Sequence, residues 1–270
     1  MKPEELVAAT ELPSTRESLC RDFRKMGIQE GDILLVHSSL SSLGWVCGGE
    51  EAVVHALQDA VGQNGTLVMP THTSNNTEPS NWQHPPAPKE WWPMIRASMP
   101  AFNPETTPTE HMGRIPECFR KFPGVLRSSH PIGSFAACGK HSAAIVAGHP
   151  LEPMFGDPSP IGRLYDRNAK ILLLGVSYDR CTSLHLAEYR SSCTKKIIQE
   201  GTAMMVDGVR AWVDVSIVAL DTDDFEQIGA AFEETRRVVM GRIANSASKV
   251  FQMRDLVDFA VPWMNIHRPG

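Results

Sequence analysis

A histidine and a glutamate three residues apart, His185 and Glu188, have the residue types and spacing best suited to acid–base chemistry. Residues at i and i+3 of a helix share one face, so the two side chains can meet. A carboxylate beside an imidazole fixes its tautomer and raises its basicity, as a general base requires. An ordinary solvated helical pair has the same spacing, so the surrounding segment must distinguish the two interpretations.

The surrounding segment predicts a buried strand, a polar turn and a helix. Residues 171–176 form a short apolar run interrupted by glycine, which is typical of a buried strand. A polar turn follows, and residues 182–190 are expected to be helical, with Thr182 or Ser183 capping the first turn. Because α/β proteins place reactive groups at the carboxyl ends of strands, this context favours a functional role for the pair.

A turn rich in hydroxyl groups follows an earlier predicted strand at residues 32–37. Hydroxyl and backbone N–H groups at such a turn could hold phosphate or pantetheine amides. Plain turn chemistry is the alternative, and the histidine could be a satisfied core residue. The glycines of a nucleotide P-loop or a dinucleotide fingerprint are absent. The candidate cofactor contacts here are His37, Ser38, Ser39, Leu40 and Ser41.

A second polar turn and several carboxylates could also contact ligands. Arg127, followed by Ser128, could pair bidentately with a phosphate, or it could form a surface ion pair. Carboxylates near turns could bind a polyamine, although most carboxylates in such places are solvated. These candidates are Glu78, Asp207, Asp214, Asp221, Asp223 and Asp224.

Ser177 stands where a serine hydrolase would place its nucleophile, in the pattern Gly175-x-Ser177-x-Asp179. That motif requires glycine at its last position, because the tight turn crowds any side chain there, and Asp179 breaks it. A hydrolase that uses Ser177 with His267 therefore remains an alternative that rests on a degenerate motif.

Helix–strand units in the first 70 residues predict the fold. Two such units in succession imply parallel pairing, so we expect an α/β fold with a mixed, mainly parallel central sheet flanked by helices. The Asp-Gly pair at 207–208 predicts a β-hairpin, and residues 224–240 and 253–264 predict amphipathic helices. We interpret these elements as a C-terminal α+β appendage of a single domain that spans residues 1–270. A proline- and tryptophan-rich stretch at 71–108 predicts an ordered loop that covers a site.

Composition narrows the class of protein. The 270 residues carry a net charge of −5 with no basic run, which disfavours nucleic acid as a partner. The 42% apolar content suits a soluble globular protein, and no apolar stretch is long enough to span a bilayer. Six scattered cysteines and ten histidines without ligand spacing predict a reduced, cytoplasmic protein with no metal site.

Taken in order, five motifs resemble the aminoglycoside 3-N-acetyltransferase family, which has the antibiotic acetyltransferase fold and is distinct from the GNAT acetyltransferases. The similarity covers nearly the whole chain and includes the pairs Trp91-Trp92 and Tyr189-Arg190 that mark one branch. The motifs are VHSSLSSLG at 36–44, GTLVMP at 65–70, RSSHP at 127–131, SPIG at 159–162 and TSLHLAE at 182–188.

The resemblance implies a reaction and roles for the candidate residues. Acetyl-coenzyme A (acetyl-CoA) would be the donor, the 3-amino group of a 2-deoxystreptamine aminoglycoside the acceptor, and no metal would take part. His185 would match the catalytic histidine, Glu188 its nearby carboxylate, and the turn at 37–41 the coenzyme A contacts. The family carries acidic residues after the Met-Pro element, and here Glu78 is the one that remains.

An amine attacks a thioester only as the free base, so we expect His185 to remove its proton and Glu188 to orient the imidazole. Thiolate leaves readily, so direct transfer in a ternary complex needs no acyl-enzyme. Backbone N–H groups near residues 38–40 would receive the charge on the thioester oxygen. The alternatives are a coenzyme A-dependent acyltransferase of another amine and a non-catalytic binding protein. We expect the protein to be a monomer or a homodimer.

Overall fold

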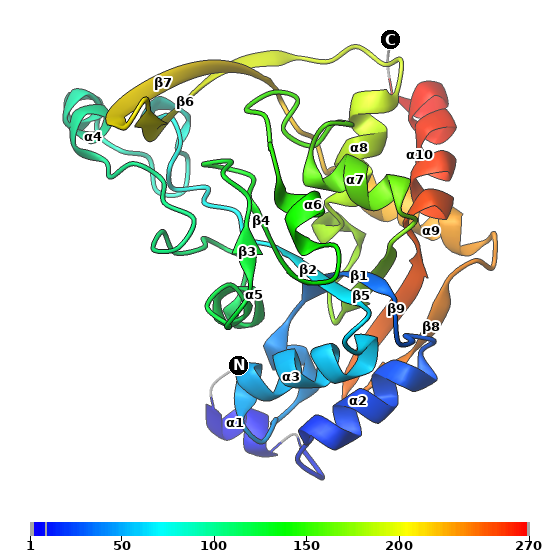
Figure 1. Ribbon diagram of the computed structural model, residues 1–270. Helices are drawn as coiled ribbons and strands as arrows, with labels where there is room; N and C mark the ends of the chain where they lie inside the picture. Colours follow the sequence, from blue (N-terminus) through cyan, green and yellow to red (C-terminus); the bar gives the residue numbers. More distant parts are fainter. Residues whose placement is uncertain (1–2, 9, 269–270) are drawn as a thin grey trace.

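A seven-stranded sheet with helices on both faces forms the centre of the protein (Figure 1). The computed structural model describes residues 3–8 and 10–268. The strand order is β3-β4-β2-β1-β5-β9-β8. These strands are β1 (Ile33–Ser38), β2 (Thr66–Pro70), β3 (Leu126–Arg127), β4 (Phe135–Gly139), β5 (Lys170–Leu174), β8 (Val239–Ile243) and β9 (Ser246–Gln252).

The mixed α/β sheet flanked by helices is confirmed, but the expectation that it is mainly parallel is wrong. Strand β1 pairs in parallel with both β2 and β5, whereas the other four neighbouring pairs are antiparallel. The two parallel pairs lie at the centre, where helices provide the crossovers that parallel strands require. Strands β8 and β9 are joined by a two-residue turn, which permits only antiparallel pairing.

The C-terminal third is not a separate appendage, because its strands β8 and β9 belong to the main sheet. The helix expected over residues 224–240 ends early: α9 spans Phe225–Glu233, and the remaining residues lead into β8. The hairpin expected around the Asp-Gly pair is confirmed as β6 (Ile197–Val206) and β7 (Val209–Val218), which form a sheet of their own. Asp207 and Gly208 have φ angles of 49° and 77°, as the tight turn requires.

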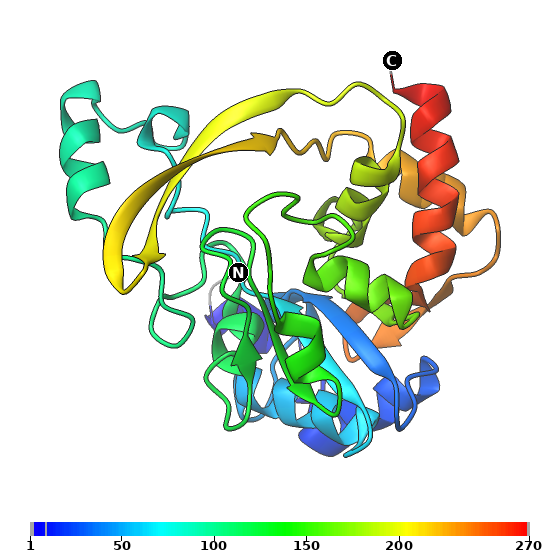
Figure 2. The same cartoon turned by 45° about the horizontal axis from the view of Figure 1, so that its top comes forward.

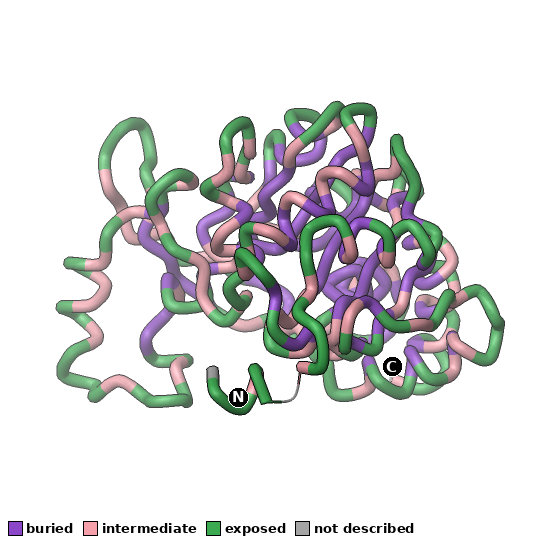
Figure 3. The backbone as a smooth tube through the Cα atoms, turned by 90° about the horizontal axis from the view of Figure 1, so that it is seen from below, coloured by how far each residue is buried: buried purple, intermediate pink, exposed green. Residues whose placement is uncertain are grey.

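Helices pack on both faces of the sheet because successive residues of each strand point to opposite sides. Leu34, Val36 and Leu174 contribute to a core with α2, α3 and α5, while Leu35 and Leu173 contribute to a second core with helices α6 to α10. Buried residues gather accordingly in the middle of the molecule (Figure 3). The helices are α1 (Pro3–Ala8), α2 (Arg16–Lys25), α3 (Gly49–Val61), α4 (Trp92–Ser98), α5 (Arg114–Phe119), α6 (Ser142–Val146), α7 (Pro160–Asp166), α8 (Ser183–Arg190), α9 and α10 (Met253–His267).

The β6–β7 hairpin arches from the α8 side of the molecule to α4, as Figure 2 shows. The irregular segment at 71–108 packs against it: the Asn76 side chain exchanges two hydrogen bonds with the Ala203 backbone, and Phe102 N–H donates to the Ala203 carbonyl. This segment contains only α4 and the short 3-10 helices η2 (Pro79–Asn81) and η3 (Lys89–Trp91). No helix within the described residues is long and apolar enough to cross a membrane.

Candidate active site

The β5–α8 connection brings His185 to the carboxyl end of the central strands. After β5, Gly175 turns the chain with a φ of 66°, and a Cβ added there would lie 1.8 Å from Ser42 Oγ. The short 3-10 helix η4 (Tyr178–Arg180) leads into α8, so His185 lies in the first turn of that helix. The expected cap is wrong, since α8 begins without any side-chain hydrogen bond from Thr182.

His185 and Glu188 form a buried hydrogen-bonded pair. His185 Nδ1 lies 2.8 Å from Glu188 Oε2, and their side chains are 11% and 4% exposed. The imidazole is flanked by Phe155, stacked at 5.4 Å between ring centroids, and by Phe225 at 5.0 Å. Because the carboxylate accepts from Nδ1–H, the Nε2 lone pair is left to accept a proton from a substrate.

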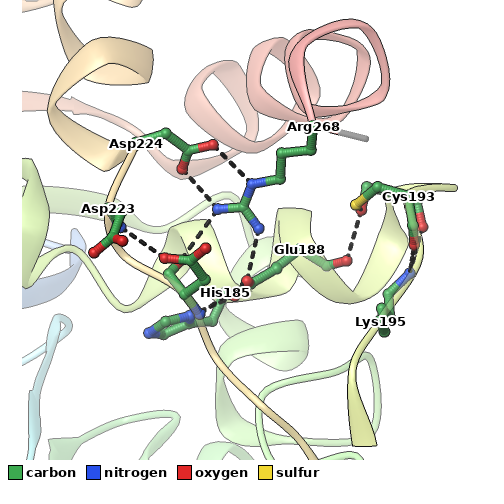
Figure 4. Close-up of polar contacts among 9 residues, drawn as sticks. His185, Glu188, Cys193, Lys195, Asp223, Asp224 and Arg268 are labelled. Atoms are coloured by element: carbon green, nitrogen blue, oxygen red, sulfur yellow. Dashed lines mark hydrogen bonds and ion pairs between the residues drawn. The ribbon is translucent and has the colours of Figure 1, made fainter. Parts of the chain in front are cut away.

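Glu188 is itself held in place by the end of the chain. Its second oxygen, Oε1, accepts hydrogen bonds from Arg268 Nη1 at 2.7 Å and from the Asp221 backbone N–H at 3.0 Å. The guanidinium also pairs with both oxygens of Asp224 at 2.6 and 2.7 Å, so it bridges two carboxylates (Figure 4). These contacts raise the pKa of Arg268, with the Asp224 hydrogen bonds the larger cause. Sequence spacing gave no sign of this arginine, which follows Glu188 by 80 residues.

A cavity of about 1090 Å³ opens beside His185. The predicted turn contributes His37, Ser38, Ser39, Leu40 and Ser41 to its walls, so the structure brings this turn and His185 to one site. Other walls come from α1, the start of α3, residues 111–114 and the aromatic ring of Phe155. This volume is sufficient for a cofactor-sized ligand and a small acceptor.

Two further histidines in the cavity wall differ from His185 in their surroundings. Burial lowers the pKa of His37 to about 3 and holds that of His72 well below its ordinary value of 6.5, and the charge of nearby His185 acts in the same direction. Both are therefore neutral at physiological pH. The backbone N–H of Ser39, expected to face a thioester oxygen, instead donates to the Leu174 carbonyl.

Arg127 and Ser128 lie outside the cavity lining, and their polar groups are bound within the protein. The Arg127 guanidinium donates to the carbonyls of Thr71 and Thr107 and to the Ser134 hydroxyl, and it packs over Phe102. Burial lowers its pKa to about 10. The Ser128 hydroxyl accepts from Phe135 N–H and contacts His149 Nδ1. We therefore leave both residues out of the proposed coenzyme A site.

Three of the six candidate carboxylates, Glu78, Asp207 and Asp214, also lie outside the cavity lining. Glu78 forms a two-pronged ion pair with Arg96, which lowers the pKa of Glu78. Asp207 occupies the hairpin turn, and Asp214 accepts a hydrogen bond from Trp212 Nε1 on an exposed part of β7. The structure therefore does not bring these residues to His185.

The residues of the hydrolase alternative are not hydrogen-bonded to each other. The Ser177 hydroxyl donates to Asp179, and no histidine of the described residues hydrogen-bonds to it. His267 stacks on Trp263, with ring centroids 4.1 Å apart, and its Nδ1 contacts the Trp263 carbonyl. A serine nucleophile needs a histidine within hydrogen-bond reach, so this geometry disfavours the hydrolase.

The mixed sheet carries a His–Glu pair beside a cofactor-sized cavity, an arrangement suited to acyl transfer. The profile of the aminoglycoside 3-N-acetyltransferase family matches residues 35–265, and the chain belongs to this family. The resemblance seen in the sequence motifs is thereby confirmed.

Individual relatives agree over nearly the full length. The chain is 43% identical, over 96% of each sequence, to the SPbeta prophage-derived aminoglycoside N(3')-acetyltransferase-like protein YokD of Bacillus subtilis. The crystal structure of YokD matches with a TM-score of 0.96 over 98% of each chain. Aminoglycoside N(3)-acetyltransferase VII of Streptomyces paromomycinus is 35% identical over 96% of this chain and 94% of its own. A binary complex of AAC-IIIb with CoASH matches with a TM-score of 0.85 at 27% identity, over 96% of this chain and 100% of the other.

Proposed function

We propose that the protein transfers the acetyl group of acetyl-CoA to the 3-amino group of 2-deoxystreptamine aminoglycosides. One observation carries this proposal: His185, with Nδ1 held by Glu188, lines the same cavity as the hydroxyl-rich turn at 37–41. The names of the relatives support the aminoglycoside acceptor, and the CoASH-bound relative supports the cofactor. No group of three or more histidine, cysteine, aspartate or glutamate side chains in the described residues could hold a metal ion.

The reaction proceeds by direct attack in a ternary complex. His185 Nε2 removes a proton from the substrate ammonium group, and the freed lone pair attacks the thioester carbonyl carbon. The C–N bond forms first, and the C–S bond then breaks. The attacking nitrogen gives its second proton to the departing sulfur, so the products are the neutral amide and coenzyme A as its thiol, and the proton on His185 passes to solvent. Glu188 stabilises the imidazolium, while Arg268 and the Asp221 N–H keep that carboxylate in place. A positioned base of this kind contributes about 10²–10⁴-fold to the rate.

Acetyl-CoA consumption with a panel of deoxystreptamine aminoglycosides tests the proposal. We expect turnover that requires both substrates, with NMR placing the new acetyl group on the 3-amino nitrogen. A product acetylated elsewhere would contradict the assigned position, and a protein that binds acetyl-CoA but never turns it over would be a binding protein.

A second candidate is a coenzyme A-dependent acyltransferase of a less cationic amine. The Glu50 and Asp179 carboxylates in the cavity wall each pair with an arginine, Arg114 at 2.9 Å and Arg180 at 3.0 Å. Substrates with several ammonium groups bind best where carboxylates are free to pair with them. A monoamine that is acetylated with a higher kcat/KM than any aminoglycoside would favour this candidate.

A further inference from the structure

Two imidazoles beside His185 have no hydrogen-bond partner among the described residues. His37 is 4% exposed, its Nε2 atom is buried, and the Nε2 atom of His72 is buried as well. Both residues line the cavity. Because a buried polar atom left unpaired costs about 1–3 kcal/mol, such atoms are uncommon in folded proteins and each requires an explanation.

Both rings lie near His185 in the fold. Strand β1 is central, and its alternation places His37 on the same face of the sheet as Leu35, which packs in the core with α8. His72 packs on Phe155 at 5.3 Å between ring centroids, and Phe155 stacks in turn on His185. The Phe155 ring therefore contacts the imidazoles of both His72 and His185.

The charge state of these rings decides what they can do. Their depressed pKa values keep them neutral, so they cannot supplement His185 as bases that gain a stable positive charge. A neutral imidazole still carries one N–H, and a neutral histidine beside a reacting carbonyl can serve as a hydrogen-bond donor. Metal binding does not explain them either, because the described residues contain no metal-binding group.

We propose that His37 donates its N–H to the carbonyl oxygen of the acetyl thioester, with His72 as a second donor to the same oxygen. The inference rests on the proposed function, since it requires the thioester to lie in this cavity. As the amine nitrogen attacks the carbonyl carbon, the C=O π electrons move to oxygen, and the two N–H groups stabilise the resulting negative charge. The electrons return when the C–S bond breaks, so neither histidine gains or loses a proton.

These side chains take a role that we had expected of backbone amides in the turn after β1. The Ser39 N–H is occupied by the Leu174 carbonyl, at 2.9 Å. Removing one preorganised donor to an oxyanion lowers kcat by about 10²–10³-fold. His37 is the main candidate, because it is the more deeply buried of the two and lies on a rigid central strand.

Infrared spectroscopy of bound acetyl-CoA labelled with ¹³C at the carbonyl carbon tests the hydrogen bond without any acceptor. We expect the C=O band of the complex to lie below that of free acetyl-CoA, and His37→Phe to shift it back towards the free value. His37→Gln retains an N–H donor and should restore part of the shift. An unshifted band in the wild-type complex would overturn the inference whether or not the variants fold.

Kinetics provide the second measurement. We expect His37→Phe to lower kcat about 100-fold while the Kd for acetyl-CoA changes less than about threefold, with His37→Gln intermediate. His130→Gln is the matched control, because His130 is also buried but its ring nitrogens contact the Leu151 carbonyl and the Gly133 N–H. That control should leave the infrared band unchanged.

The outcomes separate this inference from the proposed function. A wild-type protein that does not bind acetyl-CoA by calorimetry refutes both. If acetyl-CoA binds and is turned over, but neither the band nor kcat responds to His37→Phe, only the hydrogen-bond role is refuted. If His130→Gln shifts the C=O band as much as His37→Phe does, the shift is a general structural effect. That result would also overturn the assignment of His37 as the hydrogen-bond donor.

Discussion

The cavity beside His185 and the segment beneath the β6–β7 hairpin both bury polar groups, but they satisfy them differently. Beneath the hairpin, Glu200 Oε1 accepts from the N–H groups of Glu78 and Gly201, and its Oε2 accepts from Asn81. Glu78 is in turn paired with Arg96. In the cavity, by contrast, the imidazoles of His37 and His72 have no partner among the described residues.

We interpret the open imidazoles as groups that await a ligand, whereas the carboxylates beneath the hairpin are paired; the Thr202 hydroxyl of β6 is the exception there, since it is buried without a hydrogen-bond partner. A saturated network stabilises the fold, because every charge it buries already has a partner. Polar groups that lack a hydrogen-bond partner beside His185 gain one only when a substrate binds. The position of a carboxylate in a loop after a strand therefore does not by itself predict a contact with the acceptor. Glu78 has such a position, but it is already paired within the protein.

Acid should remove the contribution of the buried histidines, of which His37 lines the cavity, before that of the Glu78–Arg96 pair. Burial lowers the pKa of His37 and His149 to about 3 and that of His130 to about 4, from an ordinary 6.5. Between pH 6.5 and these lowered pKa values, the histidines of the unfolded chain are protonated whereas those of the folded chain are not. The free energy of unfolding is therefore highest above pH 6.5 and decreases as the pH falls. At pH 5 each of these three histidines removes roughly 2 kcal/mol, and His72, whose pKa is also held well below 6.5, adds to the loss. We therefore expect urea unfolding to show a loss of at least about 6 kcal/mol.

A variant can test the origin of this loss. His149→Gln removes one of the titrating groups, so the slope of stability against pH below 6.5 should decrease by about one proton. The carboxylate of Glu78 has a lowered pKa and should lose its contribution only at more acidic pH. Constant stability between pH 7.5 and pH 5 would mean that these histidines are not held neutral by burial.

Removing the base should produce the largest catalytic effect. We expect His185→Ala to lower kcat by about 100-fold or more and to leave the affinity for acetyl-CoA nearly unchanged, because a base acts mainly in the transition state. His267→Ala is the control, since this exposed histidine lies at the end of α10 and should be dispensable. Near-normal turnover by folded His185→Ala would refute the assignment.

A variant of Ser177 tests the hydrolase alternative. Ser177→Ala should keep most acetyl transfer, and no covalent acyl adduct should appear by intact mass. An acetylated Ser177 in quenched turnover would reverse the ranking of the two mechanisms.

Local patterns predicted much of the fold and part of the site. The apolar run of β5 and the Asp-Gly turn of the hairpin depend on neighbours in sequence, and both are observed as expected. Strand β8 was not predicted, because it is an edge strand with mostly exposed residues and no clear alternation of apolar and polar residues. Long-range pairings could not be foreseen either: nothing in the local sequence around Arg96 indicates a pair with Glu78.

Arg268 offers a test of how firmly the Glu188 carboxylate is held. Arg268→Gln leaves Glu188 and Asp224 without their shared cation, so we expect a stability loss of about 2 kcal/mol and a lower kcat. The KM for acetyl-CoA should not change, because the arginine acts through Glu188. Arg237→Gln is the matched control, since its pair with Asp255 is exposed, at 3.5 Å. An unchanged kcat would show that Glu188 keeps its position without the arginine.

The smallest expected effect comes from the saturated region, and it decides whether Glu78 is an acceptor contact, as its place in the sequence predicted. Glu78→Gln keeps the side-chain shape and removes the charge. The Arg96 side chain is 36% exposed, so water can replace the lost partner and the cost should be about 1 kcal/mol or less. We expect a slightly lower Tm, with the aminoglycoside KM and its salt dependence equal to those of the wild type. Arg96→Gln should cost more, because it leaves the Glu78 carboxylate, whose side chain is 11% exposed, without its cation. The double variant should cost less than the sum of the two single changes, because the two residues share one interaction. A raised aminoglycoside KM with a weaker salt dependence would instead mean that the substrate displaces Arg96 and pairs with Glu78.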